Sequence, residues 1–326
     1  MILVTGSSGH LGEALMRTLR ERGMPARGVD LLPSPYTDAT GSITDPEFVC
    51  AAMAGVRAVL HTAGLHKPHV GTHAARAFVD ANIIGTLTLL EAATDAAVGA
   101  FVLTSTTSAF GAALTPAAGE PAAWITEDVA AVPRNIYGTT KASAESLAEL
   151  AHRRDGLPVV VLRTSRFFPE GDDDPVKRTA YARENAQVNE LLYRRADIAD
   201  IVEAHLAAAR RAPALGFGRY IVSATTPFTP EDLGALRHDA ATVVTRRYPA
   251  AAPLYAARGW RLFPSIDRVY VNARARSALG WEPVHGFAHA LACLADGRDF
   301  RSPLSLAVGA KGYHPGRADG GPYAPG

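Results

Sequence analysis

Two side chains in the segment YGTTK have the types and the spacing that acid–base chemistry uses. Tyr137 and Lys141 stand four residues apart, so on a helix they would share one face. The Lys141 ammonium would favour the ionised phenol and bring a group with an ordinary pKa of about 10 closer to the working pH. Such pairs also occur on solvated helix faces, so this one needs support from the rest of the chain.

A glycine pattern near the start of the chain suggests what the pair could act beside. Gly6, Gly9 and Gly12 follow an apolar run in the segment ILVTGSSGHLGEAL. In this pattern the first glycine permits a tight turn, the second lets a phosphate approach the backbone, and the third lets a helix lie close to a strand. The start of that helix offers free N–H groups to an anion. The pattern therefore indicates a site for a dinucleotide pyrophosphate.

Asp30 ends the next apolar run, where a carboxylate can accept hydrogen bonds from an adenosine ribose diol. It would also repel a 2′-phosphate. No Arg or Lys follows it in LLPSP, so the pattern favours NAD over NADP. The alternative is that Asp30 only caps the junction between strand and loop.

Strands and helices must alternate to position these groups, and the apolar patterns indicate that they do. Such alternation predicts βαβ units around a parallel sheet. The strand runs near the start of the chain and at PVVVLR are apolar throughout, as expected where helices cover both faces. After about residue 167 the regularity fades. We expect strands at 1–6, 26–32, 56–64, 100–111, 157–165 and 218–224, and helices at 10–23, 45–55, 72–97, 136–156, 184–212 (with one break) and 286–297.

Composition limits the class of protein. The chain has 326 residues, 48% of them hydrophobic, and a formal net charge of +1, so neither nucleic acid nor a membrane surface is indicated as a partner. It has two cysteines, Cys50 and Cys293, which argues against a disulfide framework. We see no signal peptide and no run of about 18 uncharged apolar residues. We therefore expect a cytoplasmic protein.

The order of these segments resembles the extended short-chain dehydrogenase/reductase family, in its NAD-dependent epimerase/dehydratase branch. The resemblance implies a Rossmann-type doubly wound parallel sheet with a smaller, irregular C-terminal substrate lobe, and NAD as the cofactor. DIADIVEAHLAA and ALGWEP resemble family landmarks in the second half. Besides Asp30, the matching segments in roughly the first half are VTGSSGHLG, VLHTAG, NIIGTLTLLEAA, FVLTSTTSAFG, YGTTK and VVVLR.

The resemblance implies three catalytic residues. Tyr137 would be the acid or base, and Lys141 would lower its pKa and hold the nicotinamide ribose. The third is a hydroxyl on the preceding strand, which falls on Thr106 when counted back from the following FG pair. It would hydrogen-bond the substrate oxygen as that oxygen changes between alcohol and ketone. Ser105 and Thr107 flank it, and a slip of one residue is the alternative.

Further positions carry over from the family to the cofactor. His10 and Leu11 lie in the phosphate turn. Ser42 and Ile43 fall beside adenine, where the family usually has an acidic and an aliphatic residue, so serine is a departure. The remaining expected cofactor contacts are Thr62, Ala63 and Gly64 after the third strand, and Asn82 beneath the cofactor on the long helix.

Four histidines lie in the segment HTAGLHKPHVGTH. His69 and His73 have a spacing that can bind zinc on a helix. Pro68 and Gly71 make the segment a loop, however, and no cysteine or carboxylate completes a set, so we expect no metal site. By the resemblance, His66 falls where some sugar epimerases carry a substrate-side lysine, so it would contact substrate. The alternative is a solvated loop histidine.

The substrate end departs from the sugar-nucleotide pattern of the family. Where many epimerases have Arg, two residues and then Asn, this chain has Arg163, two residues and Arg166. Arg166 could hold a phosphate or carboxylate with its fork of donors. It could equally pair with the aspartates at 172–174. We expect Arg166, His66 and Thr107 to contact an oxygenated, anionic substrate.

The family's common chemistry starts with hydride transfer at a carbinol carbon. The leading hypothesis is an NAD-dependent epimerase that oxidises a sugar nucleotide or related sugar transiently to a keto intermediate. One alternative is an NAD-dependent dehydrogenase or reductase of a smaller sugar, sugar acid, polyol or hydroxy-ketone. Another is a non-catalytic dinucleotide sensor. Dehydration is disfavoured, because Thr107 and Ser108 stand where the family's dehydratases carry Asp-Glu.

We expect an NAD-binding domain over 1–166, a substrate lobe over 167–308 interleaved with it, and a flexible tail over 309–326, which is rich in Gly and Pro. The resemblance also suggests a homodimer through the helix around 82–91 and the helix that carries Tyr137. The Ala-rich patterns of these helices fit close packing, either between two chains or within one.

Overall fold

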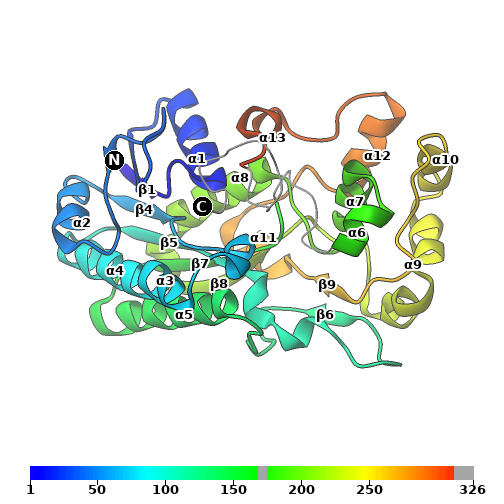
Figure 1. Cartoon of the computed structure of the whole chain (residues 1–326), viewed down its shortest axis with the longest axis horizontal. Coiled ribbons are helices and arrows are strands. Elements are labelled where there is room, and N and C mark those ends of the chain that lie inside the picture. The colour runs from blue at the N-terminus through cyan, green and yellow to red at the C-terminus, as the bar shows by residue number, and fades with distance from the viewer. Residues whose placement is uncertain (168–174, 312–326) are drawn as a thin grey trace.

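A parallel sheet forms the centre of the structure, a computed structural model that describes residues 1–167 and 175–311. It has seven strands in the order β3-β2-β1-β4-β5-β7-β8 (Figure 1). Every neighbouring pair is parallel, so the expected doubly wound sheet is confirmed. The strands are β1 (Ile2–Thr5), β2 (Ala26–Asp30), β3 (Ala39–Thr40), β4 (Ala58–His61), β5 (Ala100–Thr106), β7 (Val159–Thr164) and β8 (Phe217–Val222).

The central strands are apolar on both faces because helices cover both. Leu3 and Phe101 belong to the core on one side of the sheet, and their chain neighbours Val4 and Val102 belong to the core on the other. Both cores exclude water, which is the main favourable term in folding. The helices over Val4 are α1 (His10–Glu21) and α8 (Ile198–Leu215), and those over Leu3 are α2 (Pro46–Ala52), α4 (Gly85–Asp95) and α5 (Ile136–Asp155) (Figure 1).

Local sequence sets the ends of these helices. The Asp45 carboxylate accepts hydrogen bonds from the N–H groups of Glu47 and Phe48, and Pro46 begins α2. The Asn135 side chain accepts from the Gly138 N–H and begins α5 in the same way. Gly156 ends α5 in the left-handed conformation.

The expected long helix over 72–97 is one run with a wider turn inside it. It consists of α3 (Ala75–Val79), the π-helical segment η2 (Asp80–Ile84) and α4. By length and composition alone, the run Ala75–Asp95 could cross a membrane. In this structure α4 packs against α2 and α5 as part of the layer over the sheet.

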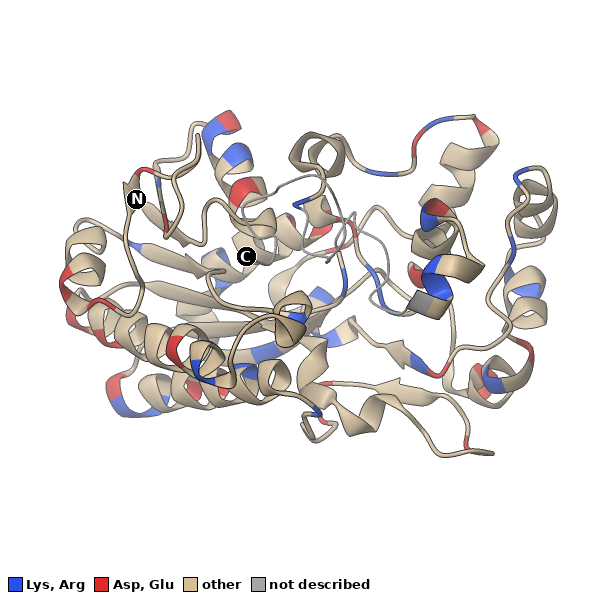
Figure 2. Ribbon diagram, in the orientation of Figure 1, with Lys and Arg blue, Asp and Glu red and all other residues tan. Residues whose placement is uncertain are grey.

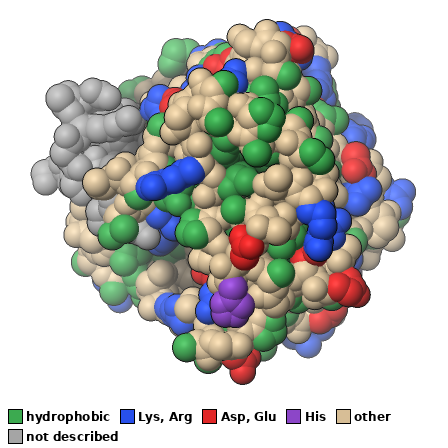
Figure 3. Space-filling model, turned by 90° about the vertical axis from the view of Figure 1, so that its right-hand side faces the viewer, with side chains coloured by type: hydrophobic (Ala, Val, Ile, Leu, Met, Phe, Trp, Pro, Cys, Tyr) green, Lys and Arg blue, Asp and Glu red, His purple; other side chains and the backbone are tan. Residues whose placement is uncertain are grey.

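The second lobe has its own apolar core, which includes Phe228, Leu236, Phe263 and Phe287. On the outer end of this lobe, acidic, basic and apolar side chains are mixed across the surface (Figure 3). It contains a parallel strand pair that sequence reasoning missed. Elements outside the large sheet and its layers are β6 (Ala123–Ile125), β9 (Arg268–Tyr270), α6 (Pro175–Ala180), α7 (Arg183–Glu190), α9 (Leu233–Arg247), α10 (Ala251–Ala256), α11 (Ala273–Leu279), α12 (Phe287–Ala295) and α13 (Pro303–Val308).

The two predicted lobes interleave along the chain. The sheet continues past residue 166, because β8 forms its edge and α8 covers one face. Conversely, β6 precedes residue 166 but pairs with β9. The predicted boundary at 166 is thus not a clean division. Most of the predicted tail, 312–326, lies outside the described residues.

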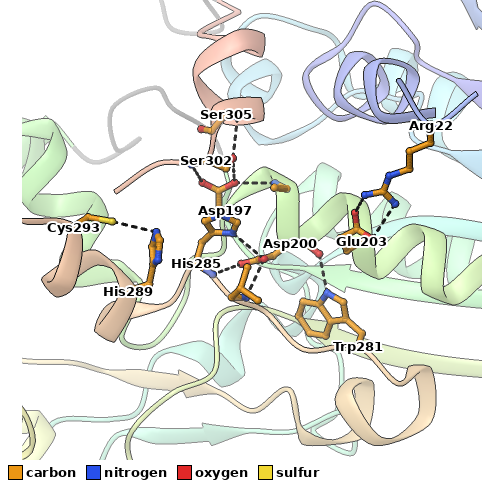
Figure 4. A network of polar contacts seen from close by, with 12 residues as sticks. Arg22, Asp197, Asp200, Glu203, Trp281, His285, His289, Cys293, Ser302 and Ser305 are labelled. Atoms are coloured by element: carbon orange, nitrogen blue, oxygen red, sulfur yellow. Dashed lines mark hydrogen bonds and ion pairs between the residues drawn. The ribbon is translucent and has the colours of Figure 1, made fainter. Parts of the chain in front are cut away.

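Two carboxylates at the start of α8 fasten later segments to the sheet layer (Figure 4). Asp200 accepts hydrogen bonds from the His285 N–H at 2.9 Å and, through its other oxygen, lies 3.0 Å from the His285 ring. The Asp200 backbone carbonyl accepts from the Trp281 indole at 2.9 Å. Asp197 accepts from the Ser302 hydroxyl at 2.5 Å. Cys293, near His289 in the same view, is a free thiol, as is Cys50.

A buried ion pair joins α5 to the sheet. The Glu145 carboxylate accepts from Arg163 on β7 at 2.8 Å and from the Ser105 hydroxyl on β5 at 2.5 Å. Arg219 on β8 approaches the same carboxylate at 3.3 Å. Glu145 is 2% exposed and Arg163 is 6% exposed, so water cannot replace either partner.

We predict that Glu145→Gln lowers the free energy of unfolding by about 3–5 kcal/mol, because Arg163 would be left as a buried charge without its counter-charge. Urea unfolding followed by circular dichroism measures this. The control is Glu149→Gln, which removes a partly exposed partner of Arg219 and should cost less than about 1 kcal/mol. Equal effects of the two variants would contradict the prediction.

Candidate active site

A cavity of about 750 Å³ lies at the carboxyl ends of the parallel strands. Ligands of doubly wound folds bind at this edge, near the point where the strand order reverses, here between β1 and β4. With one exception, Asn82, every predicted site residue lines it. Those that line it are Gly6, Gly9, His10, Leu11, Gly12, Asp30, Ser42, Ile43, Thr62, Ala63, Gly64, His66, Thr106, Thr107, Tyr137, Lys141 and Arg166.

The glycine turn connects β1 to α1 as expected. Gly6 has φ +74°, which other residues rarely adopt, and a Cβ at Gly12 would lie 1.8 Å from the Gly6 carbonyl oxygen. Only glycine therefore allows the helix to start this close to the strand. Gly9 precedes α1, whose first N–H groups face no earlier helical carbonyl. These features fit a pyrophosphate.

Asp30 braces the strand–loop junction, and its contact with the ribose, the other role that the sequence left open, stays a prediction. Its carboxylate accepts from the Ser8 N–H at 3.0 Å and from the Leu32 N–H at 3.0 Å, so it braces the glycine turn and the following loop. It also lines the cavity. A carboxylate has about four acceptor sites, so two backbone donors leave capacity for a ribose diol.

Asn82 lies beneath the cavity wall and shapes it indirectly. Its amide accepts from the Leu65 N–H at 2.9 Å and donates to the Leu65 carbonyl at 2.9 Å. It also donates to Thr140 on α5 at 3.0 Å. The π-helical segment that carries it faces the strand end here, a placement frequent at functional sites. Asn82 thus positions the Gly64–Leu65 segment, and its predicted contact with the cofactor stays a prediction.

Thr106 and Tyr137 meet inside the cavity. Thr106 ends β5, and its hydroxyl accepts from the Ser108 N–H at 3.0 Å. Tyr137 lies in the first turn of α5 and hydrogen-bonds Thr106 through its phenol. The flanking Ser105 hydroxyl is committed to Glu145, so of these two residues Thr106 presents its hydroxyl to the phenol.

The acid–base properties differ from the expectation. Burial raises the pKa of Tyr137 to about 12, and the hydrogen bond from Thr106 opposes this rise. The expected lowering of this pKa by Lys141 is not found. Burial instead lowers the pKa of Lys141 to about 8, against the opposing charge of Glu145. Tyr137 is therefore held as a neutral phenol, and Lys141 changes charge near neutral pH.

The histidines form a capped loop. The ring of His66 accepts from the His69 N–H, and the Nδ1 of His69 accepts from the His66 N–H at 3.1 Å. Neutral His69 therefore carries its proton on Nε2. Burial lowers the pKa of His69 to about 4, and that of His61, deep under the sheet edge, to about 3. Over the described ranges, 1–167 and 175–311, no group of three or more His, Cys, Asp or Glu side chains is placed to hold a metal ion.

Three arginines line the other end of the cavity, and sequence reasoning named only one of them. The Arg166 N–H donates to the Arg194 carbonyl at 3.2 Å, which joins the segment after β7 to the segment before α8. Arg268 comes from β9. Lys and Arg colour several segments between the sheet and the second lobe (Figure 2). The alternative partners of Arg166 at 172–174 lie outside the described residues.

Comparison with known proteins decides the family. The family model described as "NAD dependent epimerase/dehydratase family" matches residues 2–216. This chain belongs to that family. It is an NAD-dependent enzyme of the extended short-chain dehydrogenase/reductase type, and the glycine turn and Asp30 fit the cofactor.

The individual relatives reported next share less than a third of their aligned residues with this chain. The chain is 27% identical over 334 residues to a 3 beta-hydroxysteroid dehydrogenase/Delta 5→4-isomerase of Mycobacterium tuberculosis, covering 89% of this chain and 88% of that protein. It is 29% identical over 191 residues to a UDP-glucose 4-epimerase of Azospirillum brasilense, covering 56% and 52%. Several such matches span about half of the relative. A short-chain dehydrogenase/reductase superfamily protein from Agrobacterium tumefaciens, solved with bound NAD, superposes with a TM-score of 0.65 at 25% identity, covering 91% and 96%.

We predict that NAD affinity falls as the pH rises through about 8, the pKa of Lys141. Below that pH the ammonium is present and can donate charge-assisted hydrogen bonds to the cofactor, and above it that charge is lost. The dissociation constant for NAD, measured by calorimetry, should rise roughly tenfold between pH 7 and pH 9.5. These two pH values lie about one to two units below and above the pKa of Lys141. Lys141→Met should bind weakly at both pH values. A parallel pH profile in Lys141→Met and the wild type would contradict this.

Proposed function

We propose that this chain is an NAD-dependent epimerase that acts on a sugar nucleotide or a related anionic sugar. One observation carries the proposal: a single cavity joins the glycine turn, the Thr106–Tyr137 pair and the cluster of Arg166, Arg194 and Arg268. The first part fits the cofactor, the second fits a carbinol group, and the third fits an anion.

In this proposal Tyr137 moves the proton of the reacting hydroxyl, and Thr106 hydrogen-bonds the same substrate oxygen. When bound, NAD supplies the hydride acceptor for the carbinol carbon. The high pKa of Tyr137 keeps the phenol protonated, which is the form that returns a proton to the ketone oxygen. Oxidation needs the phenolate, which burial disfavours and the hydrogen bond from Thr106 favours. Inversion requires the ketone to present its other face before reduction.

The arginine-lined part of the cavity supports a phosphate or carboxylate on the substrate. Arg166, Arg194 and Arg268 come from three separate segments and line one cavity. The Arg194 guanidinium is paired with the buried Glu190 carboxylate and that of Arg268 with Asp267, so Arg166 is the residue to which the proposal assigns the anion contact. Guanidinium groups match planar or phosphate oxygens with paired donors. His66 lines the same cavity and would add a substrate contact.

A dehydrogenase or reductase is the second candidate. The relative matched over 89% of this chain is named a dehydrogenase and isomerase of hydroxysteroids. The same three residues would serve a smaller sugar acid, polyol or hydroxy-ketone. A dinucleotide sensor would have no use for the Thr106–Tyr137 pair. For a family epimerase we also propose a homodimer through the run formed by η2 and α4 and through α5, where Ile84 at the end of η2 and Leu150 on α5 are exposed. Sedimentation that gives the mass of one chain would contradict the dimer.

The proposed reaction is tested with UDP-glucose, UDP-N-acetylglucosamine, UDP-glucuronic acid, dTDP-glucose, free glucuronate and one hydroxysteroid. We expect isomer formation from a nucleotide sugar without net reduction of added NAD. Tyr137→Phe should lower turnover by about 10²–10⁴-fold, because the proton shuttle is lost. Net reduction of NAD would replace the epimerase with the dehydrogenase, and turnover of the steroid alone would contradict an anionic sugar substrate.

We predict that Arg166→Ala raises the Michaelis constant for the sugar substrate about tenfold or more, with a smaller effect on kcat, because a charge-assisted hydrogen bond to the anion is lost. Steady-state kinetics on the best substrate of the panel measures both constants. Arg298→Ala on the second lobe, which removes an exposed partner of Asp296, is the matched control. If neither constant changes in Arg166→Ala, Arg166 does not hold the substrate.

A further inference from the structure

A buried hydroxyl at the cavity has no hydrogen-bond partner within the part of the chain that the structure describes. Ser165 is 3% exposed, its Oγ is buried and unpaired, and the residue lines the cavity. Leaving a buried hydroxyl unpaired costs about 1–3 kcal/mol, and folded proteins pair the large majority of such groups. The chain keeps this hydroxyl where alanine would avoid the cost.

The neighbouring hydroxyls are satisfied by the protein, which sets Ser165 apart. Thr164 donates to the Ser105 carbonyl at 3.0 Å, and Ser105 donates to Glu145 at 2.5 Å. The Ser165 backbone N–H is also used, since it donates to the Val222 carbonyl at 2.9 Å. Only its side chain is left for a ligand.

The sheet register places Ser165 at the strand end next to the one that carries Thr106. Thr106 pairs with Thr164 across the β5–β7 ladder, and Ser165 is the first residue after β7. Adjacent strands lie about 4.8 Å apart. Ser165, Thr106 and Tyr137 line the same cavity, so a ligand bound at the Thr106–Tyr137 pair occupies the space that Ser165 borders, and Arg166 follows directly.

We propose that Ser165 contacts the substrate by hydrogen-bonding an oxygen on a carbon next to the reacting carbinol carbon. This inference rests on the proposed function and narrows its substrate class to vicinal polyols such as sugars. An apolar ring system like that of a hydroxysteroid would leave the hydroxyl unpaired in the complex. The sequence pattern does not identify this serine as a site residue. It is identified by its buried hydroxyl without a hydrogen-bond partner, which only the structure shows.

Ser165→Ala tests the assignment against a matched control. Ser223 also stands one residue past a strand, β8, and is fully buried, but its hydroxyl donates to the Ala224 carbonyl at 3.1 Å and it does not line the cavity. For Ser165→Ala we expect an unchanged or higher melting temperature of the ligand-free protein and an unchanged dissociation constant for NAD. We also expect a three- to tenfold rise, of the size of one neutral hydrogen bond, in the Michaelis constant for the best sugar of the panel. Ser223→Ala should lower the melting temperature and leave that Michaelis constant unchanged.

Three results would overturn the assignment. A melting temperature lowered as in Ser223→Ala would show that the hydroxyl serves the fold. Weaker NAD binding would place the contact on the cofactor, and an unchanged Michaelis constant would leave water as its partner. The melting and NAD measurements need no substrate, so they test Ser165 even if no sugar is turned over. A hydroxysteroid as the sole substrate would contradict both this assignment and the proposed function.

Discussion

The buried carboxylate of Glu145 holds the reactive helix against the sheet. It binds Arg163 on β7 and Ser105 on β5, and it lies one helical turn beyond Lys141 on α5. The same contacts that fix α5 therefore fix the distance between Tyr137 on the helix and Thr106 at the end of β5. Burial lowers the pKa of Lys141, and the negative charge of Glu145 opposes that lowering. The geometry and the charge of the site thus depend on one interaction that never touches a ligand.

The second constraint is the shared edge of a parallel sheet. Strands β1, β4, β5 and β7 all end at this edge, so the glycine turn, the Gly64 segment, Thr106 and Ser165 meet although they are far apart in the chain. The second lobe closes the edge because Asp197 and Asp200 on α8 bind its later segments. The residues expected to contact the cofactor therefore come from the edge of the sheet, and the arginines come from its junction with the second lobe.

Local patterns predicted much of this arrangement. The glycine turn, Asp30 and the Tyr137–Lys141 spacing are each contained in a few residues, and the structure brings them to one cavity. Sequence reasoning missed Arg194 and Arg268 because the pairing of segments far apart in the chain brings them to the cavity. It missed Ser165 because only the structure shows that its hydroxyl is unpaired. The expected effect of Lys141 on Tyr137 was wrong because helical spacing does not reveal burial, and burial dominates both pKa values. The sequence predicted that the two lobes interleave, but which later strand returns to the sheet is seen only in the structure, where β8 joins it after a long excursion.

The central claim is that Thr106 and Tyr137 hold a carbinol group whose carbon-bound hydrogen leaves and returns within one cavity. Turnover of a sugar substrate deuterated at the reacting carbon, in ordinary water, tests this most directly. The account predicts that the deuterium stays on that carbon in the inverted product, with slower turnover than for the unlabelled sugar. Replacement of the deuterium by solvent hydrogen would show that the carbon loses a proton to a base, and would contradict the account.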